Sequence, residues 1–96
     1  KLITIAANDI YWIEAYGDYS KLHTEGDSYI SNFGITQLEE KLNPSVFFRV
    51  HRSSIVNLNA IKQLDKYGKT YQITLNNKAT LRVSRGYMDA VKRLIF

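Results

Sequence analysis

The chain has 96 residues and no cysteine, and its 13 Lys and Arg against 9 Asp and Glu give a net charge of +4 and a pI of about 9.4. This length fits one domain with its own hydrophobic core, and the lack of cysteine excludes disulfides and thiolate metal sites. No apolar run approaches the ~18 residues that cross a membrane, and we expect no secretory leader. These features favour a cytoplasmic protein, and the absence of an initiator Met suggests a piece excised from a longer one.

The first 33 residues predict short strands that are separated by tight turns. After an apolar-polar alternation at residues 2–5, residues 6–9 suggest a turn or a single helical turn. Runs rich in β-branched and aromatic residues then predict strands at 10–16, 19–24 and 28–33, with turns at 17–18 and 25–27. We expect four of the aromatic side chains to fill the core: Tyr11, Trp12, Tyr16 and Phe33.

The rest of the chain predicts one short central helix, more strands and a C-terminal helix. Apolar residues at helical spacing indicate a helix over 36–42, which Asn43-Pro44 ends. Strands are expected at 47–56 with a short break, at 60–67 and 70–75 around the Gly68-Lys69 turn, and at 79–83, before a helix that Ser84 can cap. The sum is a mainly antiparallel domain, all-β to α+β, that spans residues 1–96.

The sequence does not favour an enzyme. His23 and His51 are far apart and lie in no metal-ligand spacing, and no Gly-rich phosphate loop is present. His51 with Ser53 or Ser54 lacks a third orienting group, and Glu39-Glu40 is most simply a solvated helix face. We therefore expect no catalysis, no metal and no cofactor.

Three basic and polar clusters favour an anionic partner. One holds Arg49, His51, Arg52, Ser53 and Ser54, a second holds Arg82, Ser84 and Arg85, and a third is the turn at 17–21. Acidic residues concentrate in the first 40 positions, which suggests one electropositive face. Arg can pair bidentately with guanine or phosphate. Simpler interpretations stay open, since Arg52 could solvate a strand edge, His51 could bond to backbone within the core, and Ser84 could only cap a helix.

The string Phe48-Arg49-Val50-His51-Arg52-Ser53-Ser54-Ile55-Val56-Asn57 closely resembles the signature of the LytTR-type DNA-binding domain, the output domain of many bacterial response regulators. Flanking segments support the resemblance, which spans nearly the whole chain: residues 10–15 with Gly17-Asp18-Tyr19, residues 38–42, and residues 81–85 with Tyr87. The resemblance implies an elongated, mostly β fold of about ten short strands. It also implies that loops, and not a recognition helix, enter successive major grooves of duplex DNA.

Carried over by position, the resemblance implies three contact regions: Tyr19, Ser20 and Lys21; Arg52 with His51 and Ser53; and Arg85. We expect Arg52 and Arg85 to read base edges, Lys21, Arg49 and Ser53 to position phosphates, and His51 to support the central loop. Relatives vary at the first loop, and some have a His at or near the position of Ser20. The resemblance further implies promoter DNA with direct repeats, an upstream receiver domain and a homodimer on DNA. The alternative is a non-enzymatic module that binds protein or RNA.

Overall fold

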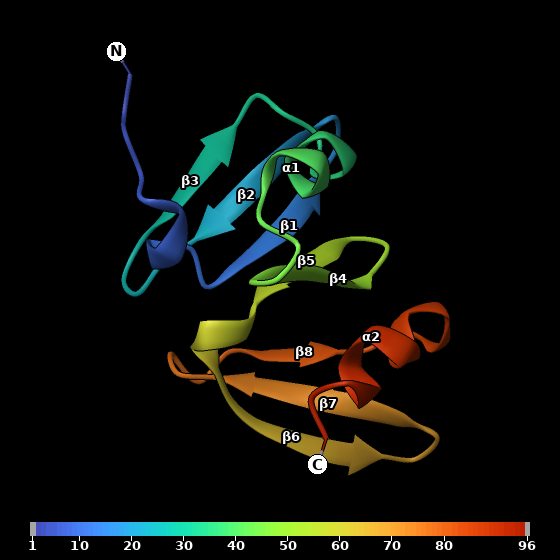
Figure 1. Cartoon of the computed structure of the whole chain (residues 1–96). Helices are drawn as coiled ribbons and strands as arrows, with labels where there is room; N and C mark the ends of the chain where they lie inside the picture. Colours follow the sequence, from blue (N-terminus) through green and yellow to red (C-terminus); the bar gives the residue numbers. More distant parts are fainter. Residues whose placement is uncertain (1, 96) are drawn as a thin grey trace.

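The computed structural model describes residues 2–95 and contains two antiparallel sheets, two short helices and three 3-10 turns (Figure 1). The first sheet has the order β3-β2-β1-β5-β4 and is formed by β1 (Trp12–Tyr16), β2 (Tyr19–His23), β3 (Ser28–Ser31), β4 (Phe47–His51) and β5 (Ser54–Asn57). The second has the order β6-β7-β8 and is formed by β6 (Ile61–Tyr67), β7 (Thr70–Leu75) and β8 (Thr80–Arg82).

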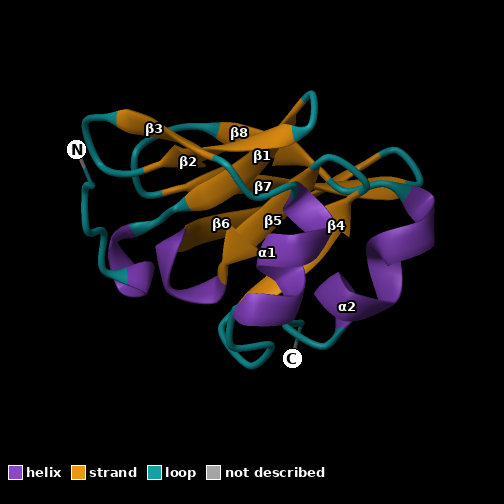
Figure 2. Ribbon diagram, turned by 90° about the horizontal axis from the view of Figure 1, so that it is seen from above, coloured by secondary structure: helices purple, strands orange, loops and turns teal. Residues whose placement is uncertain are grey.

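The helical segments lie between or beside these strands. Helix α1 (Ile35–Lys41) connects β3 to β4, and α2 (Met88–Lys92) follows β8. The 3-10 turns are η1 (Ala7–Asp9), η2 (Leu58–Ala60) and η3 (Arg85–Tyr87). Both α-helices lie on the same side of the strands (Figure 2). None of the helices in residues 2–95 has the length and apolar character needed to span a membrane.

Strands β4 and β5 lie between two hydrophobic clusters. Phe47 and Ile55 point toward α1, where they pack with Leu38. Val50 and Val56 point the other way, into a cluster that the second sheet and α2 complete with Ile73, Leu75, Leu81, Val83 and Val91. Most of these side chains are fully buried, and each contributes about 1.5–3 kcal/mol relative to the exposed state. The shared strands therefore tie both sheets into one elongated body of 44 × 23 × 22 Å.

Two tight turns require a left-handed backbone, and glycine supplies it in both. Gly17 has a φ of 61° in the turn between β1 and β2, and Gly68 has a φ of 60° in the turn between β6 and β7. These turns reverse the chain within two residues. As a result, β1 and β2, and likewise β6 and β7, pair up to the residues that flank each turn.

The mainly β fold with a central and a C-terminal helix is confirmed, but several details differ from expectation. Residues 2–5, which carry an apolar-polar alternation, lie outside both sheets, and Leu2 is 99% exposed. Eight strands are present in residues 2–95 instead of the ten or so that the resemblance implies. Tyr11 and Trp12 do pack beside the core, whereas Tyr16 and Phe33 are exposed. Tyr16 lies at the end of β1 and belongs to neither hydrophobic cluster, so its ring stays half-exposed.

Candidate nucleic-acid interface

The three predicted contact regions lie at or next to the same ends of their strands. Residues 19–21 begin β2 just after the turn at 17–18, residues 51–53 end β4 and form the turn to β5, and Arg85 begins η3 just after β8. Figure 1 shows them one after another along one long side of the molecule, at the right of the view. Strand pairing in the two sheets places them there, because β1 and β8 end where β4 ends.

A bulge in β4 connects the central turn to the last segment. Arg49 pairs with Ile55 and His51 with Ser54, so Val50 is an extra residue between the two pairs. The carbonyl oxygen of Val50 accepts a hydrogen bond of 3.0 Å from the backbone N–H of Ser84. This bond fixes the chain one residue before Arg85 against the strand that leads to Arg52.

A second backbone bond connects the central turn to the first. Strand β1 pairs with β5 as far as Glu14 opposite Ser54. The N–H of Ala15 then donates to the carbonyl oxygen of Ser53 over 2.9 Å, just before the chain turns at Gly17. The central turn and the end of β4 that leads into it are therefore hydrogen-bonded to β1 and to Ser84, which holds the three regions in a fixed relative position.

Arg52 and Arg85 are exposed, and neither forms an ion pair within residues 2–95. Two full positive charges thus project from adjacent, hydrogen-bonded segments. Guanidinium groups at such positions can bind phosphate or a guanine edge bidentately. Of the expected site residues, Arg52 and Arg85 are thus the arginines whose charges are available to an anionic partner on one side of the molecule.

Arg49 makes contacts within the protein that the sequence did not predict. Its side chain is only 12% exposed, and its Nη1 donates to Oε1 of Glu39 on α1 over 2.7 Å. Its Nε donates to the carbonyl oxygen of His51 over 3.0 Å, and its Nη2 donates to the carbonyl oxygen of Arg52. The guanidinium therefore bonds to the central turn and to α1, and the phosphate contact expected of Arg49 stays a prediction. The guanidinium braces the backbone that carries Arg52.

His51 and Ser53 form a local pair within the central turn. The Nδ1 atom of His51 accepts from the backbone N–H of Ser53 over 3.2 Å and lies 2.9 Å from its Oγ. Because Nδ1 accepts a backbone proton, the neutral ring carries its own proton on Nε2. This matches the interpretation of His51 as a half-buried histidine that bonds to backbone and supports the loop.

The first turn presents only part of its expected set. Tyr19 is 50% exposed, and Lys21 is half-buried with its Nζ 5.5 Å above the ring of Tyr16. Ser20 is fully buried, and its hydroxyl has no hydrogen-bond partner. Side chains alternate along a strand, so Ser20 points under the sheet while Tyr19 and Lys21 point away from it. The Ser20 side chain is therefore turned away from the surface, and the DNA contact expected of Ser20 stays a prediction.

Tyr16 is a surface residue that was missed beside this turn. It is 53% exposed and pairs across the strands with Tyr19. Alternation could have revealed it, since Ile13 and Ala15 take the inward positions of β1. The turn therefore combines two half-exposed rings with one ammonium group.

The segment after β8 begins with a 3-10 turn instead of the expected capped helix. Ser84 precedes η3, but its side chain makes no capping hydrogen bond, and α2 starts only at Met88. Its backbone N–H is used by Val50, as described above. Ser84 therefore anchors this segment through its backbone and not through its hydroxyl.

The remaining histidine belongs to the sheet surface. The ring of His23 stacks on Trp12 with 4.3 Å between centroids, and its Nε2 lies 2.9 Å from Oε1 of Glu14. No group of three or more His, Cys, Asp or Glu side chains able to hold a metal occurs between residues 2 and 95.

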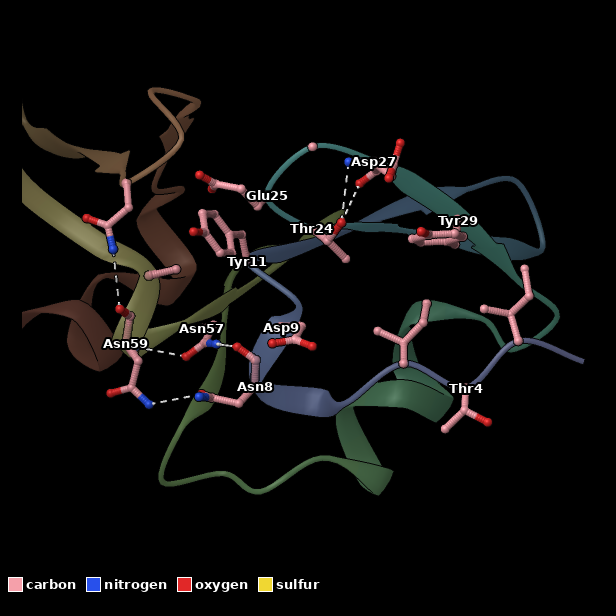
Figure 3. Close-up of a pocket in the computed structure, with 15 residues that line it drawn as sticks. Thr4, Asn8, Asp9, Tyr11, Thr24, Glu25, Asp27, Tyr29, Asn57 and Asn59 are labelled. Carbon is pink, nitrogen blue, oxygen red and sulfur yellow. Dashed lines mark hydrogen bonds between the residues drawn. The ribbon is translucent and has the colours of Figure 1, made fainter.

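A polar groove of about 600 Å³ lies at the opposite ends of the strands (Figure 3). Its walls include the carboxylates of Asp9, Glu25 and Asp27, and Asn57 closes its base by donating to the carbonyl of Ile10 over 2.9 Å. A hydrogen bond to the Glu25 carboxylate raises the pKa of Tyr11 above its ordinary value of 10.0. Three carboxylates repel phosphate, so this groove is unsuited to a polyanion.

Comparisons with known proteins agree with this geometry. The family model described as the LytTr DNA-binding domain matches residues 1–96. The transcriptional regulatory protein YpdB of Escherichia coli K12 is 38% identical over 97 residues, and LytR of Staphylococcus aureus N315 is 29% identical over 96. Each alignment covers 99% of this chain but only 40% and 39% of the relative, so the chain spans about two fifths of their length.

A solved structure gives the same result for the fold. It is the LytTr DNA-binding domain of a protein described as a methyl-accepting/DNA response regulator from Bacillus cereus. It is 25% identical in sequence, superposes with a TM-score of 0.89, and the match covers 98% of this chain and 88% of that one.

Proposed function

The chain belongs to the LytTr DNA-binding domain family, and we propose that it binds duplex DNA sequence-specifically, through its three turns, to regulate transcription. The observation that carries the proposal is the pair of backbone hydrogen bonds, Ala15 to Ser53 and Ser84 to Val50, which join the turns at the exposed Arg52 and Arg85. Because these loops are already ordered, DNA binding through their cations does not carry the entropic cost of ordering them.

The dimensions of the body support contact with more than one groove. Its longest extent is 44 Å, and one turn of B-DNA spans about 34–36 Å. The row of turns follows this long direction in Figure 1. A duplex lying along the row would meet the turn between β1 and β2 near one groove and Arg85 near the next.

Within this proposal the side chains divide into readers, phosphate contacts and supports. Arg52 and Arg85 read base edges, where a bidentate pair with guanine discriminates against other bases by about 1–3 kcal/mol. Lys21 and Tyr19 contact the backbone near the first turn, and Ser53 contributes through the central turn. His51 and Arg49 hold that turn in shape.

Selection of bound sites from random duplexes tests the proposal. The wild-type domain should enrich a defined site at low salt. Arg52→Ala and Arg85→Ala should each weaken that site more than random DNA, because they remove base reading. Lys78→Gln provides a matched loss of charge in the turn before β8, away from the row. Failure to enrich any site, or equal losses on selected and random DNA, would contradict the proposal.

Single-stranded nucleic acid is the second candidate, because Tyr16 and Tyr19 are half-exposed beside Lys21 and could stack on unpaired bases. A competition assay with duplex, single strands and RNA of one sequence separates the two candidates. The duplex should compete best. Preferential competition by a single strand, lost in Tyr16→Leu and Tyr19→Leu, would favour the second candidate instead.

We extend the proposal to the longer protein in which such a domain works. Residues 1–96 act as one binding domain, without catalysis of their own, in the cytoplasm. An upstream receiver domain promotes dimerisation on direct repeats in promoters. The names of YpdB and LytR as transcriptional regulators, both more than twice as long as this chain, support this arrangement. Footprinting of the full-length protein on its promoter, with and without phosphorylation, tests it.

A further inference from the structure

The hairpin of β6 and β7 lies on the same side of the molecule as the three turns, but it has no role in the contacts proposed so far. Its turn, Gly68-Lys69, follows the end of β8 along the row (Figure 1). Lys69 is exposed, and so are Tyr67 and Arg82, which lie on the outer face of this sheet. The hairpin therefore adds basic and aromatic groups at one end of the row.

Arg82 and Tyr67 form a stacked pair on that outer face. The guanidinium carbon of Arg82 lies 4.0 Å from the centre of the Tyr67 ring. Register explains the contact, since Arg82 is opposite Gln72 in β7, and Tyr67 is opposite Thr70 in the same strand. A guanidinium stacked on a ring keeps its N–H edges free, and stacking restricts a long side chain before any ligand arrives.

No carboxylate competes for this guanidinium. Within residues 2–95, Arg82 forms no ion pair. The acidic residue on the same sheet face is Asp65, and its Oδ2 accepts from Nε2 of Gln63 over 2.8 Å. An exposed arginine without an ion pair, stacked on a ring and on the same sheet as an exposed lysine, is suited to an anion with several oxygens, such as a phosphodiester.

We propose that Arg82, stacked on Tyr67, and Lys69 form a fourth contact, which binds backbone phosphates at one edge of the DNA site. This inference rests on the proposed duplex binding. The contact adds affinity but no base reading, because it lies beyond Arg85 at the end of the row. Tyr67 is a positioning residue that holds the guanidinium in place.

Salt titrations and phosphate-ethylation interference test the contact on the duplex selected by the wild-type domain. Arg82→Gln and Lys69→Gln should each reduce the slope of log K against log salt by about 0.9, because each removes one phosphate contact. Interference should disappear at phosphates on one flank of the site. The base preference should stay unchanged, and Lys78→Gln should keep both the slope and the pattern.

Tyr67 variants test the stacking separately. Tyr67→Leu should weaken the flank interference that Arg82→Gln abolishes, whereas Tyr67→Phe should preserve it because the ring remains. A merely structural role for Tyr67 would lower thermal stability without moving this flank signal.

The outcomes separate this inference from the function on which it rests. If the wild type enriches a site but the Arg82→Gln and Lys69→Gln slopes and patterns equal the wild type's, the fourth contact is overturned while the proposed function stands. If the wild type binds no duplex at low salt, both are overturned.

Discussion

Replacing Arg49 by methionine tests whether the Arg49 side chain stabilises the central turn or contacts DNA. The substitution keeps the length and apolar stem of the side chain but removes its hydrogen bonds to the carbonyls of His51 and Arg52 and its ion pair with Glu39. Hydrogen bonds from a charged donor contribute about 1.5–3 kcal/mol each, and an exposed ion pair contributes about 0–1. Because water can replace the donor at a surface turn, we take the lower end of each range and expect a loss of about 3 kcal/mol in the free energy of unfolding.

Urea denaturation and DNA titrations at several salt concentrations measure the two effects together. Arg49→Met should lower stability and weaken binding to the selected site, because the backbone at Arg52 is no longer held. Its salt slope should remain that of the wild type, whereas Lys21→Gln should lower the slope by about 0.9. Glu39→Gln serves as the control and should cost no more than about 1 kcal/mol. Unchanged stability with a lower slope would mean that Arg49 contacts phosphate and that the brace is wrong.

Three further predictions concern single side chains. On the selected duplex, Arg52→Ala and Arg85→Ala should each lose about 1–3 kcal/mol of binding free energy, measured by fluorescence anisotropy. A loss no larger than the loss on random DNA would contradict base reading. Ser20→Ala should leave DNA affinity unchanged and maintain or raise the unfolding free energy, since it removes a buried hydroxyl without a partner; weaker binding would restore Ser20 as a contact. Glu25→Gln should lower the pKa of Tyr11 toward 10.0 in an NMR titration. That bond stabilises the fold below about pH 10, and its contribution disappears as the pH rises through the raised pKa; an unchanged pKa would refute the contact.

The order of elements was predictable because local patterns and tertiary packing agree over most of the chain. The turn at Gly17 and the hairpin around Gly68 were found from turn residues, and helix α1 from its apolar spacing. Ser84 was expected to cap a helix, but its backbone N–H bonds to Val50, a contact between distant residues that no local pattern contains.

The candidate site was predictable in its residues but not in their roles. The sequence places Arg49 and Arg52 close together as two cations. Only the position of Glu39 on α1 shows that Arg49 forms an ion pair while Arg52 stays exposed. The burial of Ser20 follows from strand alternation, which was not applied to that turn. The pairing of Arg82 with Tyr67 depends on the register of three strands.

An NMR titration of the labelled domain with its selected duplex tests the account's central claim most directly. Amide signals of residues 17–21, 51–54 and 84–87 should shift together and saturate at one concentration, while those around Asp9, Glu25 and Asp27 stay in place. Shifts confined to one of the three segments, or centred on the acidic groove, would contradict the claim that joined turns present their cations to one duplex.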